Sequence, residues 1–255
     1  MERLRVGKLS GREEMRYALE AALLLGFQSE SAVFPVASPD GEIRIPGTED
    51  ELAGLWKLED SEIPEGYLPA EKKGPVFDLD FRKEKGLEYL FSKGLFLQDE
   101  DADMLPDKLA VKLVLPDGAD EWMLMAACNI AFRFGMETTA YEGGILAPEG
   151  YEGNAVVFSF AEQAEVTYQE TSGAVRVHIA GKGKELLELS NLLCEKFPLA
   201  DGIWKSWRDV LLDWTDDFAM RGADGQLAYL SALSGKKEGL ALYGAPEISE
   251  EQKKH

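Results

Sequence analysis

Two segments of this chain are similar to each other, and the similarity restricts how the chain can fold. Residues 12–41 align with residues 121–150 without a gap, so that every matched pair is 109 positions apart. The matched residues are mostly small or turn-forming: Ala18 with Ala127, Ala22 with Ala131, Gly26 with Gly135, and Pro39-Asp40-Gly41 with Pro148-Glu149-Gly150. Similarity at a fixed spacing is the signature of a repeated architecture, so we interpret the chain as two related units. Chance similarity between two ordinary helix–turn–strand segments is the alternative.

A second, weaker match supports the same interpretation. Residues 74–91 align with residues 173–190, and in both copies a strand-like segment passes into a helical one. Strand-like segments at 4–9 and 109–115 also precede the two copies of the first match. The order of the elements is therefore repeated along with the residues.

Both copies of the first match contain a strongly apolar segment with helical spacing. We predict one helix from about residue 11 to 25 and another from about 118 to 134, and we expect Gly26 and Gly135 to end them in the left-handed conformation. Polar side chains occupy a narrow stripe of each helix, so each should be covered over most of its circumference. We expect these helices in the core or in a dimer interface.

The remaining segments predict strands and further helices. Residues 31–37 and 42–45 flank Pro39-Asp40-Gly41 and predict a hairpin. In the second half, four segments predict a meander of strands: 138–146, 155–160, 164–170 and 174–180. Three later segments predict helices: 184–197, 202–220 and a short one near 226–233.

These elements predict an α+β fold with an internal duplication of a β-α-β-β-β-α unit. The sheets should be mixed or antiparallel, with helices on one face and extra helices near the C-terminal end. We expect one unit over residues 1–104, a second over 105–235, and a flexible charged tail over 236–255.

The charge balance excludes several classes of partner. The 255 residues include 27 basic and 47 acidic side chains, which give a formal net charge of −20. Such a surface repels phosphate backbones and anionic membranes, so neither a nucleic acid nor a membrane is an expected partner. No apolar run reaches the roughly 18 residues of a membrane span, and we expect a cytoplasmic protein. Two cysteines and two histidines are too few for a disulfide framework or a zinc cluster.

Asp78 and Asp80 are candidates for metal-dependent catalysis. Carboxylates two positions apart on a strand share a face and can hold Mg²⁺. Their pattern resembles the Asp-x-Asp of phosphotransferases that use an aspartyl nucleophile, but Arg82 stands where that pattern has Thr or Val. His178 is a candidate general base because histidine titrates near neutral pH. A strand with an exposed acidic face and a partly exposed strand histidine are the structural alternatives.

A second candidate site is the run Gly181-Lys182-Gly183-Lys184, where a predicted strand enters a helix. Amide groups at a helix N-terminus and in glycine-rich turns bind phosphate, and the two lysines add positive charge. The run is shorter than a P-loop, and Leu186 occupies the third glycine position of a dinucleotide-binding motif. A tight turn between strand and helix is the alternative.

A stripe of large apolar residues follows at helical spacing. Its members are Trp204, Trp207, Leu211, Trp214 and Phe218. Such side chains dominate both protein cores and interface hot spots. The stripe therefore predicts either core packing or a contact with a partner or a second copy of the chain.

Together these patterns favour a non-catalytic, acidic binding or regulatory protein that acts through contacts with a protein partner or in a homodimer. No convergent nucleophile and base, metal-ligand cluster or cofactor motif is recognisable, and this function requires no cofactor. The alternative is a magnesium-dependent phosphohydrolase, or a binder of a phosphorylated small molecule, with its site between the two units. There Asp78 and Asp80 would hold the metal, and Lys182 and Lys184 would bind the phosphate.

Overall fold

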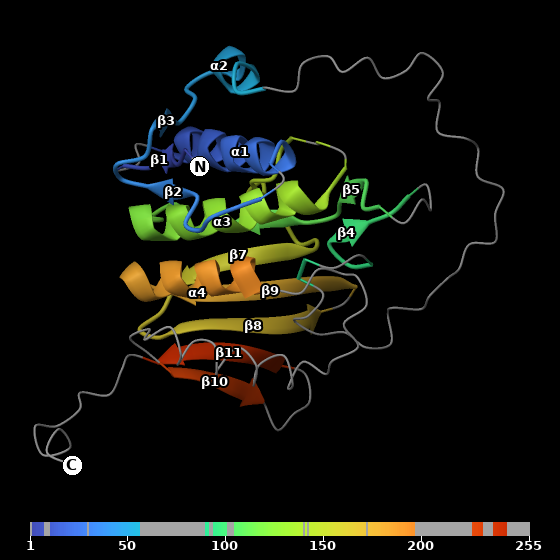
Figure 1. The fold of residues 1–255 in the computed structure, drawn as a ribbon. Helices are drawn as coiled ribbons and strands as arrows, with labels where there is room; N and C mark the ends of the chain where they lie inside the picture. The colour runs from blue at the N-terminus through green and yellow to red at the C-terminus, as the bar shows by residue number, and fades with distance from the viewer. Residues whose placement is uncertain are drawn as a thin grey trace, which may run out of the picture.

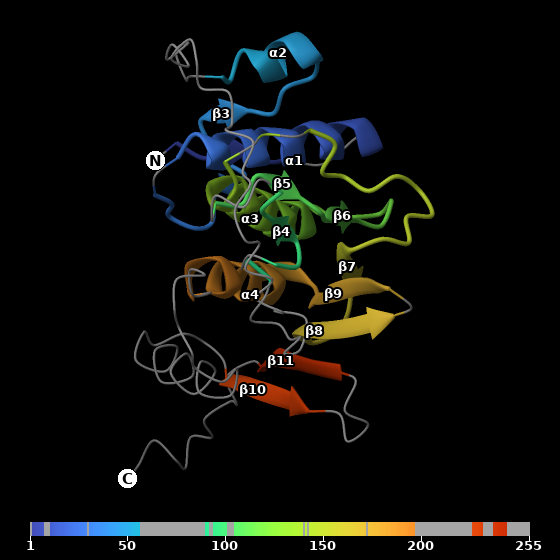
Figure 2. The same cartoon turned by 90° about the vertical axis from the view of Figure 1, so that its right-hand side faces the viewer.

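The fold combines helices with mixed sheets, as the sequence predicts for an α+β protein (Figures 1 and 2). The computed structural model describes the following residues: 2–7, 11–29, 31–56, 90–91, 94–100, 105–139, 141, 143–171, 173–196, 226–231 and 237–243. Figure 1 shows α1 (Arg12–Phe27), α3 (Glu121–Glu137) and α4 (Gly183–Lys196) stacked in that order, with α4 beside the strands of the largest sheet.

The first sheet is small and entirely parallel. β1 (Leu4–Arg5) lies between β2 (Ala37–Ser38) and β3 (Ile43–Arg44), and α2 (Glu49–Ala53) follows. The predicted hairpin is therefore wrong, because the segment with Pro39-Asp40-Gly41 carries the chain across β1. A Cβ atom at Gly41 would lie 2.4 Å from the carbonyl oxygen of Leu4, so this crossing requires glycine.

The second sheet has six strands in the order β10-β11-β8-β9-β7-β6. Its members are β6 (Lys112–Val114), β7 (Ala155–Phe160), β8 (Ala164–Thr171), β9 (Ala174–Gly181), β10 (Gln226–Ser231) and β11 (Lys237–Tyr243). β6, β7 and β9 are parallel, and the other neighbours are antiparallel. A short two-stranded sheet joins β4 (Leu97–Gln98) and β5 (Lys108–Leu109).

The predicted meander is wrong because β9 lies between β7 and β8. The loop after β7 passes over the end of β9, where the N–H of Ala161 donates to the carbonyl of Gly181 at 3.2 Å. A Cβ atom at Gly181 would lie 3.1 Å from Cα of Ala164. The glycine thus leaves room for the crossing loop. The strand predicted over 138–146 is also wrong, since the described residues of this segment form a single parallel bridge, Leu113 with Leu146, and no strand.

The C-terminal part differs most from the prediction. Residues 226–231 form β10 instead of a short helix, and residues 237–243 form β11 instead of part of a flexible tail. β11 pairs with β8, a strand about seventy positions earlier in the chain that would otherwise form the edge of the sheet. Such pairing between distant segments has no local sequence signal. The helix predicted over 202–220 lies outside the described residues, and the unit boundaries remain predictions.

Both apolar helices continue through the glycines that were expected to end them. α1 includes Gly26 and α3 includes Gly135, because these residues lie where the two helices cross. A Cβ atom at Gly26 would lie 2.0 Å from the carbonyl oxygen of Phe132, and one at Gly135 would lie 2.1 Å from that of Leu23. The expectation that both helices are buried is confirmed.

The two close contacts at this crossing are made by residues that correspond to each other in the alignment of 12–41 with 121–150. Phe132 is 109 positions after Leu23, as Gly135 is after Gly26. The strands before the helices behave in the same way. Leu4 pairs in parallel with Ala37, and Leu113 bridges in parallel to Leu146. Matched residues therefore make matched backbone contacts.

Candidate functional site

Glu20 is a buried carboxylate that joins α1 to the segment after α3. Its side chain is 2% exposed, and Oε1 accepts hydrogen bonds from the backbone N–H groups of Gly144 at 2.6 Å and Ile145 at 2.8 Å. The hydroxyl of Tyr141 donates to Oε2 at 3.2 Å. Burial, together with the charge of Glu20, raises the pKa of Tyr141, so the phenol remains a donor at neutral pH.

Asn129 occupies the matching position on α3, 109 residues after Glu20. Its Oδ1 accepts a hydrogen bond from the backbone N–H of Val36 at 2.9 Å. Its Nδ2 donates to Oγ of Ser190 at 2.9 Å and to Oδ1 of Asn191 at 2.7 Å, both on α4. Both polar groups are used by hydrogen bonds within the protein, so we assign Glu20 and Asn129 to folding and not to chemistry.

Three aromatic side chains, Phe27, Trp56 and Tyr141, form a group that we call the aromatic cluster. The ring centroids are 5.8 Å apart for Phe27 and Trp56, 6.1 Å for Phe27 and Tyr141, and 6.2 Å for Trp56 and Tyr141. At these separations the rings touch one another and leave no space for a ligand between them. Trp56 nevertheless remains 45% exposed. Trp56 is therefore accessible from outside while its ring packs against Phe27 and Tyr141.

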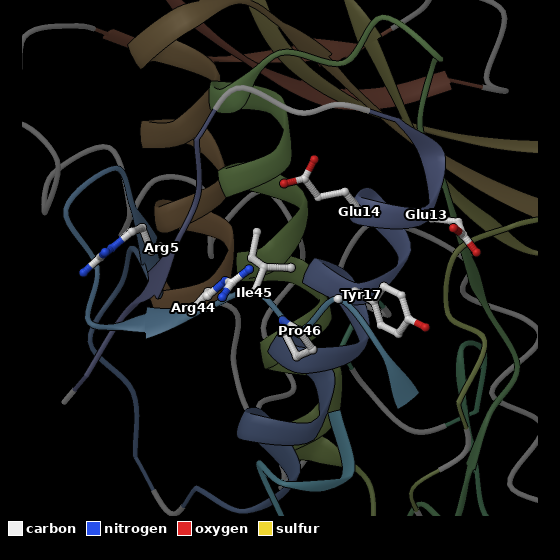
Figure 3. A pocket seen from close by; sticks show the side chains of 8 residues that line it. Arg5, Glu13, Glu14, Tyr17, Arg44, Ile45 and Pro46 are labelled. Carbon is white, nitrogen blue, oxygen red and sulfur yellow. The ribbon is translucent and has the colours of Figure 1, made fainter. Parts of the chain in front are cut away.

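A hollow of about 340 Å³ opens between α1 and the strands of the first sheet (Figure 3). We call it the arginine pocket after Arg5 and Arg44. The residues that line it are Arg5, Glu13, Glu14, Tyr17, Arg44, Ile45, Pro46 and Gly47. In Figure 3, the two arginines lie on the strand side, and Glu13 and Tyr17 lie on the α1 side. The pocket thus combines charged groups of both signs with a partly apolar wall.

Several predicted site residues lie outside the described residues. These are Asp78, Asp80, Trp204, Trp207, Leu211, Trp214 and Phe218. Within the part of the chain that the structure describes, no three side chains of the metal-ligating types come together. The proposed magnesium site and the proposed interface helix therefore remain predictions.

The run Gly181-Lys182-Gly183-Lys184 lies at the turn from β9 into α4, as predicted. Nζ of Lys182 lies 2.5 Å from a carboxylate oxygen of Glu162. Nζ of Lys184 lies 3.0 Å from a carboxylate oxygen of Glu188. Each lysine thus has an acidic neighbour within the protein. The side chains of Lys182, Glu162 and Lys184 are well exposed, and that of Glu188 is partly buried. Phosphate binding at this turn remains a prediction.

His178 and the two cysteines lie in the secondary structure expected for them. His178 is half-buried on β9, where it is paired in register with Val157 and Thr167. Cys128 on α3 and Cys194 on α4 are both buried free thiols, which agrees with core positions. Burial raises the pKa of Cys128 to about 12 and also raises the pKa of Cys194. Neither thiol forms an appreciable amount of the reactive thiolate at neutral pH.

Sequence reasoning missed the arginine pocket and the aromatic cluster. Arg5 and Arg44 are separated by 39 positions and become neighbours only through the parallel pairing of β1 with β3. The sequence does contain one signal for them, because each arginine stands beside apolar residues in a short strand-like stretch. Trp56 carried no comparable signal, since its two aromatic neighbours come from distant parts of the chain, Phe27 from α1 and Tyr141 from the segment after α3.

Comparison with models of protein families and with curated protein sequences finds no match for this chain. Among the described residues, no helix combines the length and apolar character that crossing a membrane requires. Any function must therefore be argued from the sites themselves.

Proposed function

We propose that this chain is a non-catalytic, acidic binding or regulatory protein that acts through protein–protein contacts. The observation that carries the proposal is the aromatic cluster, in which Trp56 is 45% exposed while it stacks on Phe27. Tryptophan is enriched among the residues that dominate binding energy at interfaces. A ring already held by its neighbours loses little conformational freedom on binding, which favours a tight contact.

The charge of the chain supports a particular kind of partner. With 47 acidic and 27 basic residues, the protein attracts a partner with a basic surface and accelerates their encounter. Long-range attraction of this kind is screened by salt, whereas the contact of a tryptophan is not. We therefore expect the association rate with the partner to fall at high salt. The loss of binding caused by a substitution of Trp56 should be the same at low and high salt.

The phosphohydrolase or phosphate-binding alternative has less support. Asp78 and Asp80 lie outside the described residues, and Lys182 and Lys184 already have carboxylate neighbours. At these four residues nothing further favours this alternative, so we retain protein binding as the proposed function.

We also propose that the two segments related by 109 positions arose by internal duplication. Two observations support the proposal. Gly26 and Gly135 make reciprocal close contacts with the opposite helix. Glu20 and Asn129 each accept a hydrogen bond from a backbone N–H that is also related by 109 positions. Chance similarity would not be expected to preserve such pairs of contacts.

The proposed function is tested by chemical cross-linking and affinity capture from the native host, with wild type, Trp56→Ala and Phe160→Ala compared. Phe160 is a suitable control because it is also an aromatic residue, 50% exposed, but lies on β7 outside the aromatic cluster. We expect wild type and Phe160→Ala to capture the same partner protein or a second copy of the chain. We expect Trp56→Ala to capture neither. If every captured protein is retained equally by both variants, the proposal is wrong.

A further inference from the structure

We propose that Arg5 and Arg44 form a binding site for a small organic molecule that carries a phosphate or carboxylate group. The two arginines are direct partners in the parallel pairing of β1 with β3. Neighbouring strands are about 4.8 Å apart, and side chains at paired positions lie on the same face of a sheet. Both arginines are exposed and line the same pocket. The fold therefore places two arginines at paired positions beside one hollow, with their head groups pointing in different directions in Figure 3.

This arrangement costs energy in the free protein. Like charges directly opposite on neighbouring strands are destabilising. Among the described residues, no carboxylate forms an ion pair with either guanidinium, although acidic residues outnumber basic ones in the chain by 47 to 27. Nε of Arg5 donates to the carbonyl of Gly41 at 2.6 Å, and no other hydrogen bond joins its guanidinium to the described residues. An anion in the hollow would reduce this repulsion and attract the remaining donors of both side chains.

The chemistry of the guanidinium group specifies the ligand. Its planar fork matches the oxygens of a carboxylate or a phosphate and binds them through paired hydrogen bonds. Tyr17, Ile45 and Pro46 add a partly apolar wall. The volume of about 340 Å³ lies at the lower end of the range of small-molecule sites. We therefore infer an anionic group attached to a small apolar body rather than a polyanion, which the net charge of −20 would repel.

The acidic residues of the pocket do not contradict this assignment. Glu13 and Glu14 lie in the first turn of α1, where negative charge is favoured by the helix dipole. They occupy the helix side of the pocket, and the arginines occupy the strand side (Figure 3). A ligand can therefore direct its anionic group to the arginines and its other end to α1.

The test is a calorimetric titration of the full chain with phenyl phosphate, benzoate and phenol at constant ionic strength. Phenyl phosphate and benzoate distinguish the two anionic groups, and phenol reports binding of the ring alone. We expect saturable binding of at least one anion, with no measurable binding of phenol. We expect Arg44→Gln to weaken the binding by about tenfold or more, because one charge-assisted pair of hydrogen bonds is lost.

Arg3→Gln is the matched control, since it removes the same charge from the same strand region but does not line the pocket. Arg44 is substituted first because Arg5 also bonds to the backbone at Gly41, and circular dichroism verifies that each variant is folded. The proposal is overturned if neither anion binds, if phenol binds as well as the anions, or if Arg44→Gln and Arg3→Gln bind equally. The result does not depend on whether Trp56 contacts a protein.

Discussion

A single carboxylate, that of Glu20, ties the middle of α1 to residues 141–145. It accepts hydrogen bonds from two backbone N–H groups and one hydroxyl while almost completely buried, and none of these three donors is cationic. A buried charge of this kind is tolerated because every accepted hydrogen bond is charge-assisted. Its match on α3, Asn129, performs the equivalent task with a neutral amide.

We expect Glu20→Ala to lower the free energy of unfolding by about 2 kcal/mol, because it leaves the buried N–H of Ile145 and the more exposed N–H of Gly144 without this acceptor. Glu20→Gln keeps a carbonyl oxygen for these groups and should cost about 1 kcal/mol or less. Urea unfolding followed by circular dichroism measures both values. Equal losses for the two variants would show that the charge, and not the acceptor oxygen, stabilises this contact.

At the scale of elements, the crossing of α1 and α3 organises the core. The two helices approach so closely at Gly26 and Gly135 that backbone touches backbone. A hydrogen bond from Arg133 on α3 to the carbonyl of Cys194 attaches α3 to α4, and an ion pair with Glu137 within α3 holds the Arg133 side chain. The three helices are therefore packed and bonded together, and a change at the crossing should affect all three.

We expect Gly26→Ala and Gly135→Ala to destabilise the protein by similar amounts, about 3 kcal/mol each. Alanine is favoured over glycine inside a helix by roughly 1 kcal/mol, but overpacking against a backbone that cannot yield exceeds this gain. Thermal and urea unfolding give the comparison.

Gly118→Ala is the control for both substitutions, because nothing lies within 4 Å of a Cβ atom added there. It should change the free energy of unfolding by less than about 0.5 kcal/mol. If only one of the two substitutions at the crossing lowers the free energy of unfolding, the two glycines do not contribute equally to the contact.

Local sequence patterns predicted where the helices and strands lie better than they predicted which strands pair with each other. The spacing of apolar residues identified α1, α3 and α4, because each helix closes its hydrogen bonds within a few residues. The same patterns located β7, β8 and β9 but arranged them wrongly, since a strand bonds to whichever distant segment the rest of the fold brings beside it. Gly26 and Gly135 were recognised as important, but their role depends on the opposite helix.

At the scale of the whole molecule, the net charge of −20 sets the electrostatic conditions. Excess acidic charge repels itself more strongly in the compact state than in the unfolded chain. Five of the ion pairs between described residues, such as Arg12 with Asp117, involve at least one well-exposed side chain and contribute little.

We therefore expect the melting temperature to rise when NaCl is increased from low to moderate concentration. Screening of about 1 kcal/mol of repulsion corresponds to roughly 2–4 °C for a chain of this size. Differential scanning calorimetry measures the change, and KCl should have the same effect because screening does not depend on the cation. A fall in melting temperature with both salts would mean that attractive pairs outweigh the repulsion.

The sequence alone determined the α+β class, the excess of acidic residues and the position of the main helices. These properties depend on composition and on contacts within a few residues, which a linear pattern records. Only the tertiary structure decided the order of the strands, the place of β11 beside β8, and the meeting of Arg5 with Arg44 and of Trp56 with its aromatic neighbours. Each of these depends on segments far apart in the chain, and their approach is set by packing of the whole core.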